Sequence, residues 1–169
     1  MLFAVPQGKF NQFLLAAIFI LLVRISYLDH PIQGDDYYYL AGAMHGQIDP
    51  AHPHQARYIF QGREVWMLGH PHPPLNSWVL AGILAIAGDI RAETLHAVYV
   101  GWSLLAAIGT LGLAWRYSPH PALAALLVLV SPAFLVAGNS LESDLPFLAC
   151  WTAGIAAFTA GRLRLAVPL

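Results

Sequence analysis

Charged residues are scarce in this sequence. Asp, Glu, Lys and Arg make up 10% of the 169 positions, whereas hydrophobic residues make up 58%. Because a soluble domain usually carries about a quarter charged residues, this composition predicts an integral membrane protein. The formal net charge is -1 and the few basic residues are scattered, so the sequence offers no electrostatic basis for binding nucleic acid.

Cysteine is almost absent as well. Cys150 is the single cysteine and lies within an apolar run, so no disulfide framework can form within the chain. Cysteine usage therefore does not identify a redox compartment, and we interpret Cys150 as a packing residue. The sequence also lacks internal repeats and low-complexity tracts.

Long apolar runs are the main feature that the sequence does contain. A helix rises about 1.5 Å per residue, so roughly 20 mostly apolar residues cross a hydrocarbon core about 30 Å thick. Runs of about this length predict an all-α membrane protein with about four transmembrane helices, at residues 10–28, 95–115, 122–138 and 145–161. A cleaved signal peptide is the alternative for the first run, but no small-x-small cleavage site follows Phe13–Val23.

A fifth apolar run, Leu75–Gly88, determines the predicted topology. It reaches only about 21 Å as a helix, which favours a helix on the membrane surface. Pro74 suits the first turn of such a helix. With this helix on the surface, the positive-inside rule predicts a cytoplasmic N-terminus and a long external loop at residues 29–94. The basic residues on the cytoplasmic side are then Lys9, Arg116, Arg162 and Arg164.

The external loop begins with adjacent carboxylates, Asp35 and Asp36, followed by Tyr37-Tyr38-Tyr39. The helical spacing of Tyr37, Leu40, Ala41 and Met44 predicts an amphipathic helix at the membrane surface. Asp35 could simply be the N-cap of this helix, and tyrosines are common at membrane interfaces without any function. The alternative is that one carboxylate serves as a general base or a metal ligand.

Two further polar clusters lie in external segments. His70-Pro71-His72-Pro73-Pro74 is either a rigid approach to the surface helix or, together with His52 and His54, a zinc or copper site. The segment Asn139–Pro146 contains Glu142 and Asp144, which either belong to a helix start or hold a divalent metal ion.

The order of these features resembles the C-type glycosyltransferases, in particular the branch of protein O-mannosyltransferases and lipid A aminoarabinose transferases. The resemblance rests on GDDYYY after the first span, HPPL before an apolar helix, and NSLESDLPFL before the last span. It covers most of the chain. In the family an Asp-Glu pair opens the first external loop, so Asp35 matches the catalytic carboxylate and Asp36 stands where Glu is usual. Asp144 is similar in position to the acidic residue of the second external loop.

The resemblance implies inverting transfer of a sugar from a polyprenyl-phosphate carrier to an acceptor hydroxyl on the external face of a bacterial inner membrane. Asp35 would be the base, with Asp36 as the second candidate catalytic residue. The candidate substrate contacts are Tyr38, Arg57, Arg63 and His72. Metal dependence stays open, with Glu142 and Asp144 as the candidate ligands.

Family members have many more spans, and their later segments hold the carrier phosphate. The chain therefore resembles the N-terminal part of such a transferase, and we expect no sugar transfer by the purified chain alone. Two alternatives stay open: a non-catalytic membrane module that binds a lipid-linked sugar, and a metal-handling protein that uses the histidines of the external loop.

Overall fold

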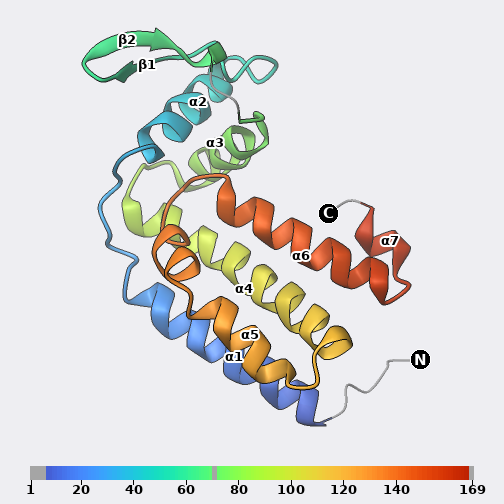
Figure 1. The fold of residues 1–169 in the computed structure, drawn as a ribbon. Helices are drawn as coiled ribbons and strands as arrows, with labels where there is room; N and C mark the ends of the chain where they lie inside the picture. Colours follow the sequence, from blue (N-terminus) through green and yellow to red (C-terminus); the bar gives the residue numbers. More distant parts are fainter. Residues whose placement is uncertain (1–6, 70–71, 168–169) are drawn as a thin grey trace. The chain divides into compact units, whose positions relative to one another are not determined.

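The computed structural model describes residues 7–69 and 72–167, drawn as a ribbon in Figure 1. The described chain forms two compact units. One unit contains residues 7–27, 99–139 and 144–167, and we call it the helical unit. The other contains residues 28–69, 72–98 and 140–143, and we call it the loop unit because it includes the described residues of the predicted external loop.

The helical unit is built from α1 (Gln7–Ile25), most of α4 (Ala92–Tyr117), α5 (Pro121–Leu129), the π-helical turn η2 (Ala133–Ala137), α6 (Asp144–Thr159) and α7 (Leu163–Ala166). Among the described residues, α1 and α4 are the two helices that are long and apolar enough to cross a membrane. They correspond to the predicted spans at 10–28 and 95–115. The protein is thus mostly helical, with two helices of spanning length.

The prediction of four transmembrane helices is not confirmed. The run at 122–138 is divided between α5 and η2, with Ser131-Pro132 between them. Proline lacks a backbone N–H and disfavours a helical conformation in the residue before it, which explains why α5 ends at Leu129. Helix α6 has only 16 residues and ends just before Gly161, whose φ of 73° is typical of a helix C-terminus.

Helices α1 and α4 are antiparallel. Trp115 Nε1 near the end of α4 donates a 2.7 Å hydrogen bond to Gln12 Oε1 near the start of α1, and Lys9 Nζ lies 5.3 Å from the same ring. At the other end of α1, Arg24 Nε donates to Ser103 Oγ of α4 at 2.9 Å. The end of α4 therefore lies beside the beginning of α1.

Helices α4 and α6 run parallel and in close contact. A Cβ at Gly109 would lie 2.6 Å from Thr152 Oγ1, and one at Gly112 would lie 3.1 Å from Ala156 Cβ. A step of one helical turn along α4 thus matches a step of one turn in the same direction along α6. Small residues at this contact allow the two backbones to approach closely, as in many membrane helix pairs.

Arg24 is a buried cation that donates hydrogen bonds to η2, the irregular segment that follows α5. Its side chain is 3% exposed. Its guanidinium donates to Phe134 O at 2.7 Å, Leu135 O at 3.1 Å and Asn139 Oδ1 at 2.9 Å, in addition to Ser103. The irregular backbone of η2 therefore obtains hydrogen-bond donors from α1, which compensates for regular helical bonds lost at the break.

The loop unit centres on a pair of packed helices, α2 (Asp36–Ile48) and α3 (Leu75–Ala87). Gly42 of α2 faces α3, because a Cβ there would lie 2.6 Å from Ser77 Oγ. Both predicted helices of the external loop are present. Two residues of the predicted amphipathic face, Tyr37 and Met44, are exposed, and a third, Leu40, is buried. The buried side of α2 also includes Asp36, Tyr39, Ala43 and Gly46.

An antiparallel hairpin of β1 (Arg57–Phe60) and β2 (Arg63–Trp66) follows α2, and the short 3₁₀ turn η1 (Met67–Gly69) follows the hairpin. The prediction of an all-α fold missed these strands. Gln61 and Gly62 form the two-residue connection with φ values of 50° and 76°, the positive values that a type I′ turn requires. The Gln61-Gly62 pair between Tyr58-Ile59-Phe60 and Val65-Trp66, which are residue types common in strands, was the sequence signal for this hairpin.

Candidate functional site

The two adjacent carboxylates lie in different environments. Asp35 precedes the first turn of α2 and is exposed. Asp35 occupies the N-cap position of the helix, as one interpretation of the sequence predicted, but its side chain forms no capping hydrogen bond. Asp36 begins the helix and is 3% exposed. One carboxylate therefore meets solvent, and the other meets the protein interior.

Asp36 binds the segment 140–143 through its side chain. Its Oδ1 accepts hydrogen bonds from Ser140 Oγ at 2.9 Å and from the backbone N–H of Leu141 at 2.7 Å. Its Oδ2 accepts a third from Gln33 N at 3.3 Å. Asn76 of α3 donates to Leu141 O at 2.8 Å, so both polar backbone groups of the buried Leu141 are satisfied. Asp36 thus ties α2 to a segment that lies more than a hundred residues later in the sequence.

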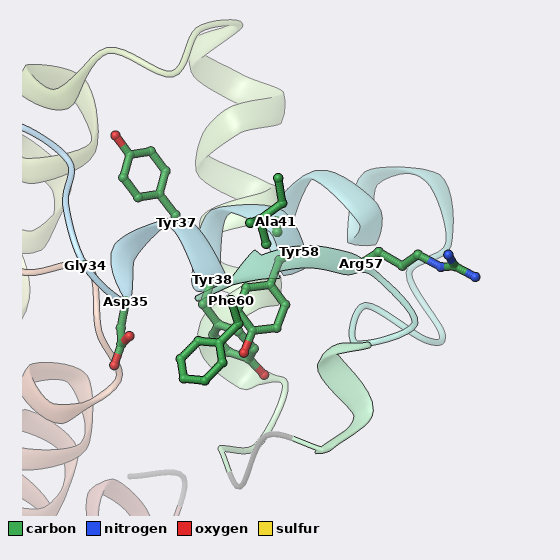
Figure 2. Close-up of a pocket in the computed structure, with 9 residues that line it drawn as sticks. Gly34, Asp35, Tyr37, Tyr38, Ala41, Arg57, Tyr58 and Phe60 are labelled. Atoms are coloured by element: carbon green, nitrogen blue, oxygen red, sulfur yellow. The ribbon is translucent and has the colours of Figure 1, made fainter. Parts of the chain in front are cut away.

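Asp35 lines a cavity of about 390 Å³. The wall comes from the start of α2 and from β1, and Figure 2 shows the rings of Tyr38, Tyr58 and Phe60 close together while the Tyr37 ring points away from them. The lining residues are Gly34, Asp35, Tyr37, Tyr38, Ala41, Arg57, Tyr58, Ile59 and Phe60. An exposed carboxylate at the edge of an aromatic cavity is a suitable place for a general base that acts on a bound hydroxyl group.

Tyr38 is a buried member of an aromatic cluster that it forms with Tyr39 and Tyr58. It is 2% exposed, and its ring centroid lies 5.1 Å from that of Tyr58 and 5.2 Å from that of Tyr39, both edge-on. Burial, followed by the neighbouring Tyr39 and Tyr58 hydroxyls, raises the pKa of Tyr38 above its ordinary value. Tyr38 therefore stays protonated and neutral at physiological pH, and it shapes the cavity rather than adding charge to it.

Of the two arginines that were predicted to contact substrate, Arg57 is paired with an acid and Arg63 is not in the cavity wall. Arg57 Nη1 lies 2.8 Å from Glu64 Oε2 across the hairpin, and its guanidinium stacks 4.2 Å from the Trp66 ring. In Figure 2 the Arg57 side chain points away from Asp35. Arg63 begins β2, is exposed and is not part of the cavity wall. The described cavity thus has a carboxylate, but its one lining arginine is paired with an acid.

The described histidines that were predicted as substrate or metal contacts have separate partners. His72 Nδ1 lies 3.3 Å from Ser143 Oγ, which also contacts the Tyr39 hydroxyl at 3.1 Å. His52 pairs with Asp49 at 3.0 Å, whereas His54 lies 3.3 Å from Ser77 Oγ and has its pKa lowered by burial. His70 falls outside the described residues.

The candidate metal ligands do not form a cluster with other ligating side chains. Glu142 belongs to the loop unit, where its backbone N–H donates to Ser140 Oγ at 3.1 Å. Asp144 begins α6 in the helical unit and lines a separate, mostly apolar cavity of about 200 Å³. Within residues 7–69 and 72–167 there is no group of three or more His, Cys, Asp or Glu side chains placed to hold a metal ion.

Sequence reasoning missed several residues that build the site. Tyr58 and Phe60 line the cavity, and the Gln61-Gly62 turn after Tyr58-Ile59-Phe60 could have revealed the strand that carries them. Ser140 and Leu141 bind Asp36. No local pattern could have revealed these two, because their partner lies in a distant part of the chain.

Comparison with protein-family models, with curated proteins and with solved structures finds no match to this chain.

Proposed function

We propose that this chain is a catalytic part of a membrane glycosyltransferase that moves a sugar from a polyprenyl-phosphate carrier to an acceptor hydroxyl at the external face of the plasma membrane. The observation that carries the proposal is that the adjacent residues Asp35 and Asp36 lie in different environments. Asp36 is buried and holds the segment 140–143, while Asp35 is exposed on a cavity. The resemblance in sequence implies that Asp35 is the base, and its exposure on a cavity supports the proposal.

In the proposed step, the Asp35 carboxylate accepts the proton of the acceptor hydroxyl. An oxygen lone pair then forms the new bond to the anomeric carbon. The bond from that carbon to the carrier phosphate breaks, and the phosphate leaves with the electron pair. Inversion follows because the acceptor attacks from the face opposite to the leaving group. General-base help of this kind contributes about 10²- to 10⁴-fold in rate.

The membrane location is supported by the apolar surface of the helical unit. Leu15 and Leu22 of α1 are 67% and 64% exposed, and Phe147 and Phe158 of α6 are 68% and 64% exposed. Many large apolar side chains exposed on the same helices are unusual on a soluble monomer, whereas lipid tails cover them in a bilayer. We therefore propose that α1 and α4 cross the membrane and that α6 packs beside them within it.

The antiparallel contact of α1 and α4 supports the proposed topology. If α1 crosses the membrane and α4 crosses back, the segment between them begins and ends on the same side of the membrane. This is expected if α3 lies on the membrane surface and does not span it. Because α4 runs antiparallel to α1 and parallel to α6, the start of α1 and the ends of α4 and α6 share one end of the helical unit. These ends carry Lys9, Arg116, Arg162 and Arg164, so the positive-inside rule favours a cytoplasmic N-terminus.

The proposal is tested in native membranes that contain the chain and its natural neighbours. With a radiolabelled polyprenyl-phosphate sugar as donor, Asp35→Asn should lower transfer by about 10²- to 10⁴-fold at equal protein level. Asp29→Asn is the matched control, because Asp29 is an exposed carboxylate in the same predicted external loop but outside the cavity wall. Transfer at the wild-type rate by Asp35→Asn would contradict the proposal and favour a non-catalytic module.

A further inference from the structure

The chemistry of the Asp35 cavity narrows the class of ligand that it accepts. Its wall offers aromatic rings from two elements, since Tyr37 and Tyr38 come from α2 while Tyr58 and Phe60 come from β1. The Tyr58 and Phe60 centroids are 6.1 Å apart, with the ring planes inclined by 51°. These two residues share one face of the hairpin because they are two positions apart on a strand.

A phosphate group does not suit this cavity. The Asp35 carboxylate repels an anion, and the lining arginine, Arg57, already pairs with Glu64 and stacks on Trp66. Figure 2 shows the Arg57 guanidinium directed away from Asp35. A phosphate placed here would therefore lose water without gaining a cationic partner.

A cationic ligand suits the proposed chemistry no better. An ammonium group would be attracted to the rings and to Asp35. However, it would pair with the carboxylate that must accept the hydroxyl proton, and a paired carboxylate is a weaker base. A neutral polyhydroxylated ring avoids both problems, because its C–H face packs on aromatic rings while its hydroxyls stay available to Asp35. The volume of about 390 Å³ is sufficient for such a ring.

We infer that the Asp35 cavity is the acceptor site and that the acceptor is a neutral sugar, stacked on Tyr58 and Phe60 with one hydroxyl directed at Asp35. This inference rests on the proposed function, in which Asp35 is the base. It makes Tyr58 and Phe60 specificity-determining residues, and it places the carrier phosphate outside this cavity.

The experiment measures binding of methyl hexopyranosides to the full chain in lipid nanodiscs, by saturation-transfer NMR. Phe60→Ala and Tyr58→Ala should each weaken binding by about 2- to 10-fold, the usual effect of losing one aromatic contact. Phe60→Leu keeps an apolar side chain on the strand but removes the ring, so it should weaken binding without disturbing the hairpin. Phe158→Ala is the matched control, because Phe158 is an exposed aromatic residue of the helical unit, and it should leave binding unchanged.

Two competing ions and the Asp35→Asn variant distinguish a neutral-sugar site from a site for an anion or a cation. Inorganic phosphate and tetramethylammonium should not displace the glycoside, and Asp35→Asn should retain glycoside binding. Failure of the neutral glycosides to bind, displacement by either ion, or equal effects of Phe60→Leu and Phe158→Ala would overturn the inference. Glycoside binding that depends on Phe60 in membranes without any sugar transfer would instead contradict the proposed function and leave the sugar site standing.

Discussion

Replacing Asp36 by alanine tests how the loop unit is held together. The substitution removes the acceptor for Ser140 Oγ, for the buried Leu141 N–H and for Gln33 N. Gln33 is exposed, so water can replace its bond, whereas Leu141 is 0% exposed and its buried N–H loses the charged acceptor that Asp36 provides. A buried donor that loses its partner costs about 1–3 kcal/mol, and a hydrogen bond to a charged group contributes about 1.5–3 kcal/mol. We therefore expect Asp36→Ala to lower the free energy of opening of segment 140–143 by about 3 kcal/mol.

The assay is hydrogen exchange of the full chain in nanodiscs, followed by mass spectrometry of peptides that cover residues 140–143. A loss of about 3 kcal/mol speeds exchange of the Leu141 amide on the order of 10²-fold. Asp36→Asn keeps the volume and one acceptor oxygen, so its effect should be smaller. Asp35→Ala is the control, because an exposed carboxylate without a capping bond should change stability by less than about 0.5 kcal/mol.

The pair Asp36 and Ser140 also permits a double-mutant cycle. Because the two side chains are in direct contact, the effects of Asp36→Ala and Ser140→Ala on exchange should be less than additive. Unchanged exchange at 140–143 in Asp36→Ala, or an equal change in Asp35→Ala, would refute the assignment of Asp36 as the residue that holds this segment.

Three other predictions concern stability. Gly109→Ala places a Cβ 2.6 Å from Thr152 Oγ1 and should lower the free energy of unfolding by about 1–3 kcal/mol, measured by thermal unfolding. The control is Gly101→Ala on the same helix, which meets open space and should not destabilise the protein. Equal melting temperatures of the two variants would contradict the α4–α6 contact. Arg24→Leu removes the donor to the carbonyls of Phe134 and Leu135 and should lower the free energy of unfolding by about 2–5 kcal/mol, with partial recovery in Arg24→Lys. An Arg24→Leu protein as stable as the wild type would refute this role of Arg24. Burial lowers the pKa of His54 below 6.5, so the folded loop unit binds fewer protons than the unfolded chain. The stability of this unit should therefore fall as the pH drops through about 6.5, and His54→Gln should flatten this dependence. An unchanged pH profile of stability in His54→Gln would contradict the role of His54.

The apolar helices of spanning length and the helices of the external loop followed from the sequence alone. Helices α1 and α4 are long apolar runs, and Pro74 and Gly88 mark the ends of α3. These features depend on local hydrophobicity and backbone preference, which residues close in sequence determine. The same local rules indicate the break at Ser131-Pro132 and the Gln61-Gly62 turn. The predicted span at 122–138 is therefore not confirmed as one helix, and the all-α prediction missed the two strands.

The roles within the candidate site depended on the tertiary structure. Two adjacent aspartates are equivalent in a sequence, and only the approach of Ser140 and Leu141 makes Asp36 a buried acceptor while Asp35 faces a cavity. Likewise Arg57 is a free cation in the sequence, but hairpin pairing brings Glu64 to within 2.8 Å of it. Composition and periodicity decide whether a segment is apolar and helical. The charge that a residue presents to a ligand depends on which distant residues fold against it, since hydrogen bonds and ion pairs act only over a few ångströms.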